Sequence, residues 1–358
     1  MKPETIKPFI TVQTGHVVTA LATMNRNSVH VCVTSPPYFN LRDYGIEPTL
    51  WCDGWTGVLG QEKTVEGYVA HLAECARAIE GVLRDDGTFW LNLGDSYVDG
   101  ELAGIPWLVA HALKADGWKV RSEIIWAKAA SFGLFAGSSR SESAKDRPTR
   151  SHEHLLMFTK RRSKTYFYDI DAIRDPREDG GTGRNTRSVW TIAPGTARKV
   201  NHSAVFPPKL ALPCILAGSS SAGACGDCGA PLARQVSSVE DDQSWKKLKG
   251  YRPRWDTTYK TERAATAIEK GEQGRPISAI FASSLRKRRV TTGWTPTCGH
   301  KVEPVPCVVL DPFCGSGSAG EAAVSVGRSF VGVDISEKSA KLSLARVAAA
   351  LPREEIVE

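Results

Sequence analysis

CVVLDPFCGSGSAG, which runs from Cys307 to Gly320, is the stretch that decides the fold. Its first half is a short apolar run typical of a buried strand, and its second half opens a helical pattern. Gly315, Gly317 and Gly320 form G-x-G-x-x-G between the two. Glycines at this spacing permit a tight turn and let backbone N–H groups at a helix N-terminus approach a ligand. The stretch predicts a βα unit with a nucleotide-type pocket.

Two acidic residues beside this turn narrow the class of ligand. Asp334 ends the next predicted strand, 19 residues beyond Gly315, where an acidic residue usually binds ribose hydroxyls. Asp311 stands immediately before the glycines, and its carboxylate would repel a pyrophosphate. A cationic ligand suits it better, and S-adenosylmethionine (AdoMet) carries an ammonium and a sulfonium group. We therefore expect AdoMet rather than NAD.

Strand-like and helical patterns alternate along most of the chain, which predicts a mostly parallel sheet covered by helices. The predicted strands are 9–15, 28–35, 87–95, 119–128, 153–160, 305–313 and 329–335. The predicted helices are 17–24, 64–83, 104–117, 317–327 and 336–351. Residues 132–194 and 219–306 interrupt this alternation and are interpreted as insertions on an α/β core.

A second unusual stretch is TSPPYFNLRDYG, Thr34 to Gly45. Its two prolines must end the preceding strand, because proline cannot donate to a sheet ladder and pushes the residue before it toward extended geometry. A stiff strand-to-loop turn would explain the pattern as well as a functional site would. The rest of the chain has to decide between these interpretations.

Composition bounds the function classes. The chain has 358 residues, 41% hydrophobic and 24% charged, and fits one large domain or two smaller ones. No apolar run reaches the roughly 20 residues that span a bilayer, and the start lacks a signal-peptide core. We expect a cytoplasmic protein with no membrane partner. Its net charge of +7 includes basic clusters that favour a polyanion, although each alone fits a solvated loop: 140–150, 160–164, 246–254 and 286–289.

The cysteines of the second insertion indicate a metal site. Nine cysteines in a cytoplasmic chain are expected to be reduced thiols or metal ligands. Cys225 and Cys228 lie at one end of the insertion, and Cys298 and His300 at the other, as a tetrahedral structural Zn²⁺ requires. Unrelated thiol pairs, or Cys307 in place of His300, remain alternatives. The loop between the pairs mixes basic residues with aromatic ones, as DNA-contacting segments do: Trp245, Tyr251 and Trp255.

Together these stretches resemble a known family. DPFCGSG resembles the AdoMet-binding motif of DNA amino-methyltransferases, and Ser35-Pro36-Pro37-Tyr38 matches their second motif, (S/N/D)-P-P-(Y/F/W). The second motif precedes the first, as in the circularly permuted β group, including its phage and prophage type. The resemblance covers most of the chain, including LGQEKTVEGYVAHL, LNLGDSY, EIIWAK, DRPTRSHEHLLMFTK, GRNTRSVW, HSAVFPPKL and GRSFVGVDISEKSAKLSLAR.

The resemblance implies a Rossmann-like AdoMet methyltransferase sheet, circularly permuted, with a recognition insertion and a zinc-ribbon-like insertion. Ser35 and the Pro36 carbonyl would hold the exocyclic amine of a base flipped out of double-stranded DNA, Pro37 would stiffen the turn, and Tyr38 would stack on the base. His16 stands where relatives often have Asp. The implied cofactor-binding residues are Phe206, Asp311, Phe313, Gly315, Ser316, Gly317 and Asp334, with His202 and Pro207 nearby and 209–219 as a helix beside the glycine loop.

The resemblance also implies a division of the chain. Residues 1–131 would form the catalytic half of the core, 132–194 the target-recognition region, 195–218 with 307–358 the AdoMet-binding half, and 219–306 the zinc-stapled insertion. The arginines expected to contact phosphates or guanines are Arg147, Arg150, Arg184 and Arg187.

The target and the biological role stay less defined. Ser before Pro-Pro-Tyr favours the N4 amine of cytosine in this family, with the N6 amine of adenine as the alternative. A C5-cytosine enzyme would need a Pro-Cys nucleophile, and Pro213-Cys214 and Pro306-Cys307 are poorly positioned for it. A non-catalytic DNA-binding relative and an RNA or protein methyltransferase are weaker hypotheses. We expect an orphan or prophage methylase of a bacterial or phage-infected cell, monomeric or homodimeric.

Overall fold

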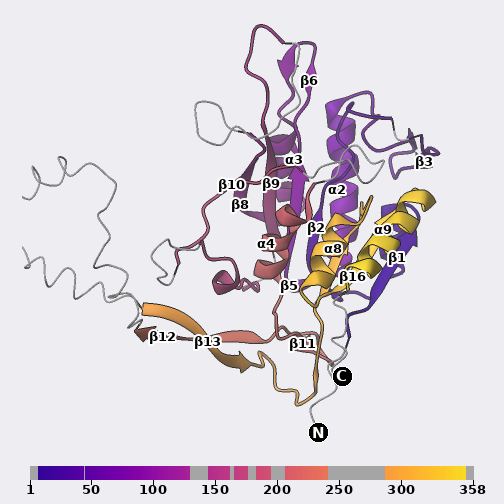
Figure 1. The fold of residues 1–358 in the computed structure, drawn as a ribbon. Helices are drawn as coiled ribbons and strands as arrows, with labels where there is room; N and C mark the ends of the chain where they lie inside the picture. Colours follow the sequence, from indigo (N-terminus) through magenta and orange to yellow (C-terminus); the bar gives the residue numbers. More distant parts are fainter. Residues whose placement is uncertain are drawn as a thin grey trace, which may run out of the picture. The chain divides into compact units, whose positions relative to one another are not determined.

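An eight-stranded sheet organises the chain (Figure 1). The computed structural model describes residues 7–43, 45–129, 144–161, 165–175, 183–194, 206–240 and 287–351. The sheet order is β1 (Ile10–Thr14), β16 (Ser329–Asp334), β15 (Val308–Asp311), β2 (Val29–Thr34), β5 (Leu83–Leu93), β9 (His152–Lys160), β8 (Trp118–Ala127) and β10 (Val189–Thr191). Among these described strands β9 alone runs antiparallel to its neighbours, so the prediction of a mostly parallel sheet is confirmed.

Helices cover both faces of the sheet and bury two apolar clusters (Figure 1). One face carries α1 (Val17–Ala22), α2 (Val65–Val82) and α3 (Ile105–Ala115); the other carries α4 (Pro208–Gly218), α8 (Ser318–Ser325) and α9 (Glu337–Ala349). The strands supply alternate residues to the two clusters, with Cys32 on the first side and Val31 and Val33 on the second. No described helix is long and apolar enough to cross a membrane.

The predicted element boundaries differ from the structure mainly around β5. The sequence predicts a helix that ends at Leu83 and a strand that starts at Gly87, whereas β5 begins at Leu83, directly after α2. Leu83 pairs with Val29, and the register shifts before Thr88 pairs with Val31. The polar residues in between therefore form an irregularity inside the strand. The short strand β10 has no counterpart among the predicted strands.

The remaining described elements are small. They are the ribbons β3 (Thr49–Leu50) with β4 (Thr56–Gly57), β6 (Tyr97–Val98) with β7 (Glu101–Leu102), β11 (Ala224–Cys225) with β14 (Pro304–Val305) and β12 (Ala233–Glu240) with β13 (Lys287–Thr295), and a 3₁₀ turn η1 (Ile170–Ala172). The chain divides into two compact units. The first comprises Met1–Ile173, Arg187–Ala233 and Trp294–Glu358, and the second comprises Arg174–Thr186 and Arg234–Gly293.

The strand order of the sheet has a switch point between β2 and β15, from which the chain connections lead in opposite directions. These two strands are parallel neighbours, with Val309 opposite Val31 and Leu310 opposite Cys32. After β15 the chain passes through α8 to β16 on one side, and after β2 it passes through α2 to β5 on the other. Ligands of open α/β sheets bind at the carboxyl ends of strands at such a switch point. The two motifs singled out in the sequence follow these two strands.

Candidate active site

The glycine loop after β15 has the conformation that its sequence requires. Gly315 and Gly317 have φ values of 49° and 84°, in the left-handed region that favours glycine. Gly320 has a different role, because a Cβ there would lie 2.6 Å from the ring of Phe330. The first two glycines shape the turn, and the third lets α8 pack closely on β16.

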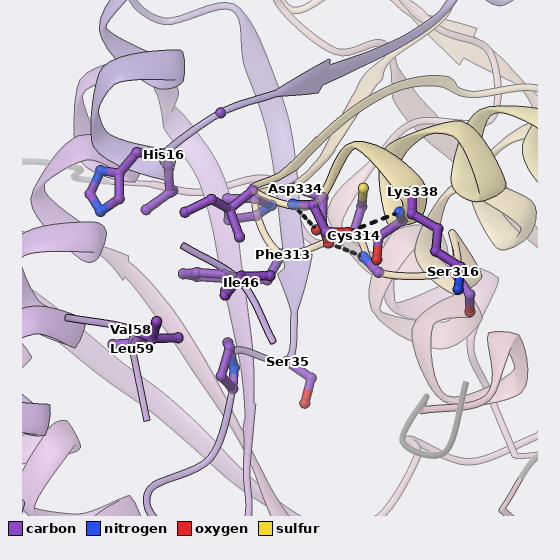
Figure 2. Close-up of a pocket in the computed structure, with 18 of the residues that line it drawn as sticks. His16, Ser35, Ile46, Val58, Leu59, Phe313, Cys314, Ser316, Asp334 and Lys338 are labelled. Carbon is purple, nitrogen blue, oxygen red and sulfur yellow. Dashed lines mark hydrogen bonds between the residues drawn. The ribbon is translucent and has the colours of Figure 1, made fainter. Parts of the chain in front are cut away.

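Asp334, at the end of β16, holds this loop in place. One oxygen of its carboxylate accepts a hydrogen bond from the Gly315 N–H at 2.8 Å, and the other accepts from the Ser336 N–H at 2.9 Å (Figure 2). Ser336 is the N-cap of α9 and accepts from the Ser339 N–H. Asp334, the residue predicted to bind ribose, therefore also joins the glycine loop to the start of the next helix.

A cavity of about 620 Å³ lies beside the loop. Figure 2 shows Asp334, Ser316 and Lys338 on one side of it, and Val58 and Leu59 on the other. This volume is ordinary for a site that takes a cofactor-sized molecule. The predicted site residues that line the cavity are Ser35, Pro37, Phe206, Phe313, Gly315, Ser316 and Asp334; Pro36, Tyr38, Asp311 and Gly317 do not, and His202 lies outside the described residues.

Asp311 is buried rather than open to the cavity, with 1% of its surface exposed. Its Oδ1 accepts from the Thr34 hydroxyl at 2.6 Å and from the Phe313 N–H at 3.1 Å. Burial raises the pKa of this carboxyl to about 7, and the nearby Asp334 adds to the rise. Asp311 thus joins the ends of β2 and β15 and titrates near neutral pH.

His16, the departure from the family pattern, lines the cavity. Its ring lies edge-on to Trp51 with 4.7 Å between centroids. Burial lowers its pKa, which favours the neutral imidazole. Its Nε2 is buried and has no hydrogen-bond partner among the residues that the structure describes. A buried polar atom of this kind is costly unless a ligand reaches it, so His16 fits a nucleoside in this cavity.

The Ser-Pro-Pro-Tyr turn is fixed from several sides. Tyr68, fully buried on α2, donates from its hydroxyl to the Pro37 carbonyl at 2.7 Å. Gly94 gives room to Tyr38, since a Cβ there would lie 2.8 Å from the Tyr38 ring. The Ser35 and Tyr38 hydroxyls lie 3.0 Å apart. The turn is therefore preorganised before any substrate binds.

Three residues that the sequence analysis did not identify complete this site. Tyr38 donates to Glu153 Oε2 at 2.7 Å, and the Asn92 amide donates to the same carboxylate at 2.6 Å. Lys128 forms an ion pair with the other oxygen of Glu153. Asn92 is the last residue but one of β5, Glu153 is the second residue of β9 and Lys128 follows β8. They lie within the quoted motifs LNLGDSY, SHEHLLMFTK and EIIWAK, whose positions at strand ends were the available signal.

Two of the predicted DNA-contacting arginines lie beside the hairpin that follows β5. The Arg147 guanidinium lies over the Tyr97 ring at 3.6 Å, and that of Arg150 at 5.3 Å. Arg150 also donates to the Asp95 carbonyl. The other two differ. The backbone of Arg184 forms an isolated β-bridge with Asp175 in the second unit, and Arg187 is the residue at which the chain returns to the first unit.

The predicted metal ligands come together in space. The ligand atoms of Cys225, Cys228, Cys298 and His300 all lie within 4.8 Å of one another, and Cys225 Sγ is 3.7 Å from His300 Nδ1. Cys307 is outside this group, and its Sγ faces the Ser220 carbonyl. The loop residues predicted to contact DNA, Trp245, Tyr251 and Trp255, lie outside the described residues.

The cysteine cluster is bound to the sheet at the end opposite the cavity. His30 Nε2 lies 2.9 Å from the Gly229 carbonyl, and its Nδ1 accepts from the Val308 N–H at 3.0 Å. Arg84 donates to the Cys228 carbonyl at 2.6 Å. The loop that carries the first two cysteines is thereby attached to β2, β5 and β15.

Neither Pro-Cys pair can supply a nucleophile in the described structure. Cys214 is fully buried in α4, and Cys307 is fully buried before β15. Burial raises the pKa of both thiols, that of Cys307 to about 11. A buried thiol that stays protonated is inert, so the C5-cytosine alternative has no residue to carry it.

Comparisons with known proteins agree with this geometry. A family model for N6/N4 methyltransferases, described as DNA methylase, matches residues 29–228 and 306–345, more than half of the chain. The Type II methyltransferase M.XycI of Xanthomonas campestris pv. cyanopsidis is 39% identical over 234 residues, covering 57% of this chain and 71% of its own length. M.Cfr9I of Citrobacter freundii is 36% identical with the same coverage.

Solved structures share the fold. A putative DNA modification methylase of Thermus thermophilus, solved in complex with S-adenosyl-L-methionine, superposes with a TM-score of 0.51 and 19% identity, covering 96% of this chain and 94% of its own. The cytosine-N4-specific PvuII DNA methyltransferase superposes with a TM-score of 0.55 and 14% identity, covering 98% and 91%. The central sheet with its flanking helices is therefore a methyltransferase fold.

Proposed function

The chain belongs to the N6/N4 DNA methylase family and is an AdoMet-dependent DNA methyltransferase, and we propose that it methylates the N4 amine of cytosine in double-stranded DNA. The observation that carries the choice of base is Ser35, a neutral hydroxyl at the first position of the motif and on the wall of the cavity. Family members with Ser there more often modify cytosine N4, and those with Asp or Asn more often modify adenine N6.

The cavity supports a specific placement of the cofactor. Phe313, Gly315 and Ser316 would surround AdoMet, His16 would meet its nucleoside part, and Asp334 supplies a carboxylate on the same wall. When bound, AdoMet would supply an electrophilic methyl group to the exocyclic nitrogen of the base. Asp334 on the cavity wall, and the ionised form of the buried Asp311, favour a cationic ligand over an anionic one.

The turn supports a role in holding the amine. The nitrogen lone pair of the amine is conjugated with the ring of the base. Hydrogen-bond acceptors for the amine hydrogens help to localise that lone pair toward the methyl carbon. The Ser35 hydroxyl and the Pro36 carbonyl are the proposed acceptors, and Tyr38 is the proposed stacking partner of a flipped base. The bond from Tyr68 to Pro37 fixes the turn, so these acceptors need no rearrangement at the moment of reaction.

The test is transfer of tritiated methyl from AdoMet to unmethylated DNA, with the digested nucleosides resolved by mass. We expect N4-methylcytosine from the wild type and at least a hundredfold less from Ser35→Ala, since a preorganised polar contact is worth on the order of 10² in rate. Calorimetric AdoMet binding by the variant serves as the control for folding. N6-methyladenine as the product would overturn the proposed base and keep the enzyme class.

The same proposal includes a division of labour along the chain. The proposed target-recognition region, 132–194, contains β9 and β10, which belong to the central sheet, so its remaining segments are the proposed DNA-contacting parts. Arg147 and Arg150, which lie over Tyr97 in the hairpin that follows β5, support this. The strand that leads to Ser35, β2, precedes the strand that carries Asp311, β15, in the chain yet lies next to it, which supports a circularly permuted arrangement.

We also propose a structural Zn²⁺ bound by Cys225, Cys228, Cys298 and His300. Tetrahedral Zn²⁺ with bonds of about 2.0–2.3 Å needs four such atoms within about 4 Å of one another, close to the spacing described. Four protein ligands leave no open position, so the ion would not take part in methyl transfer. Its proposed role is to staple the ends of the segment 219–306 to the core.

A further inference from the structure

The hydroxyl of Ser35 is the end of a chain of hydrogen bonds whose direction is fixed at its other end. Glu153 is a carboxylate paired with Lys128, so both of its oxygens accept and neither donates. Tyr38 has a single hydroxyl hydrogen, and it points to Glu153 Oε2 over 2.7 Å. Burial, with Glu153 second, raises the pKa of Tyr38 well above its usual range, so this hydrogen is kept at neutral pH.

That single hydrogen decides the next bond. The Ser35 and Tyr38 oxygens are 3.0 Å apart and share one hydrogen bond, in which either could donate. Because the Tyr38 hydrogen is committed to Glu153, Ser35 has to be the donor in this pair. Ser35 Oγ also has the Asn92 amide nitrogen at 3.4 Å, and because Ser35 lines the cavity, its remaining lone pair is available to a ligand there.

Asn92 reinforces this direction. Its amide nitrogen lies 2.6 Å from Glu153 Oε2 and 2.7 Å from the Tyr38 hydroxyl. Glu153 cannot donate, so the amide must turn its NH₂ group toward the carboxylate, and Tyr38 then receives hydrogens from both Asn92 and Ser35. The Asn92 carbonyl oxygen is buried and has no partner among the described residues, which leaves a second acceptor in the cluster for a donor to satisfy.

We propose that Glu153 is a positioning residue that sets the donor direction through Tyr38, so that Ser35 presents an acceptor to an N–H of the target amine. This inference rests on the proposed function of Ser35. With an uncharged amide at position 153, an NH₂ group can donate to Tyr38, and Tyr38 can then donate to Ser35. Ser35 would then direct its own hydrogen at the amine and oppose the reaction.

The experiment compares Glu153→Gln, Tyr38→Phe and the double variant with the wild type in single-turnover methylation of DNA. We expect Glu153→Gln to lower the single-turnover rate constant on the order of 10²-fold, with the Kd values for AdoMet and DNA changed less than about threefold. In the Tyr38→Phe background, which keeps the ring and removes the relay, the same substitution is expected to change the rate less than about threefold.

Glu123→Gln is the matched control, because Glu123 is a neighbouring carboxylate paired with His154 outside the cluster, and it should keep the wild-type rate. Equal effects of Glu153→Gln with and without the Tyr38 hydroxyl would overturn the relay, as would a wild-type rate in Glu153→Gln. Loss of methylation in Glu153→Gln through a weaker AdoMet Kd would overturn it too. A wild-type protein that binds AdoMet but does not label DNA would instead refute the proposed function.

Discussion

At the scale of single residues, Asp311 makes the clearest prediction. Its carboxyl is buried and its pKa rises from 3.8 to about 7, so the folded protein binds this proton more tightly than the unfolded chain does. The free energy of unfolding of the cofactor-free protein should therefore fall as pH rises from about 4 to 7, and Asp311 should add no slope above that. The full effect is on the order of 4 kcal/mol.

Binding of AdoMet should show the opposite trend. A cation stabilises the ionised carboxylate, so its affinity should increase as pH rises through 7. Asp311→Asn keeps an acceptor for Thr34 and removes the titration, so both slopes should flatten in this variant. Urea unfolding and calorimetric titration between pH 5 and 8 measure the two slopes. Parallel pH profiles for the wild type and Asp311→Asn would show that another group is responsible.

The sequence predicts residues well where chemistry depends on short spacing. The glycines, Asp334 and the Ser-Pro-Pro-Tyr turn are recognisable because each needs particular neighbours within the same stretch. Asn92, Lys128 and Glu153 were missed because only the pairing of β5, β9 and β8 brings them together. The burial of Asp311 was missed for the same reason, since it results from the side-by-side placement of β15 and β2.

At the scale of elements, the cysteine cluster and the active site lie at opposite ends of the same strands. His30, at the amino end of β2, contacts the cysteine loop and the start of β15. Ser35 and Asp311 follow at the carboxyl ends of these strands. The loop therefore helps to hold together the two strands whose other ends build the cavity, and the proposed ion should support stability rather than chemistry.

Metal analysis and unfolding measurements test this. We expect about one zinc per chain in the wild type, little in Cys298→Ser, and full occupancy in Cys52→Ser, which alters an exposed cysteine outside the cluster. A chelator should lower the unfolding midpoint of the wild type and of Cys52→Ser, and leave Cys298→Ser unchanged. Equal zinc content in all three proteins would refute the ligand assignment.

Long, strongly patterned elements were predicted from the sequence with small errors, and short ones were not. The periodicity of α2 and the apolar runs of β2 and β9 are properties of the local sequence. The start of β5 depends on Leu83 pairing with Val29, and β10 is a three-residue strand that exists because it pairs with β8. Tertiary pairing decides such elements, and local patterns do not contain it.

At the scale of the whole molecule, the net charge of +7 favours binding to DNA, which is a polyanion. Arg147 and Arg150 both lie over Tyr97 in the β6–β7 hairpin, where a phosphate backbone could reach both. Each phosphate contact contributes about 0.9 to the slope of log K against log salt concentration. Alanine at both positions should therefore make this slope shallower by roughly 2.

Fluorescence titration of an unrelated DNA duplex measures this slope. The titrations run from about 50 to about 200 mM salt, where the loss of affinity with salt is large. Arg77→Ala is the matched control, because Arg77 already pairs with Asp116 between α2 and α3. An unchanged slope in the double variant would show that these arginines contact the protein and do not contact DNA phosphates.

The hydrogen bond from the Thr34 hydroxyl to the Asp311 carboxylate joins residues that are 277 positions apart in the sequence. A ribosome that adds about 5–20 residues per second needs roughly 15 to 55 s to pass from one to the other. During that interval β2 lacks its neighbour β15, and β1, at the sheet edge, lacks its partner β16. The nascent chain consequently exposes unpaired strands and cannot complete the cavity until β15 and β16 have emerged. A product that terminates before β15 lacks the glycine loop and Asp334, and we expect it to be inactive.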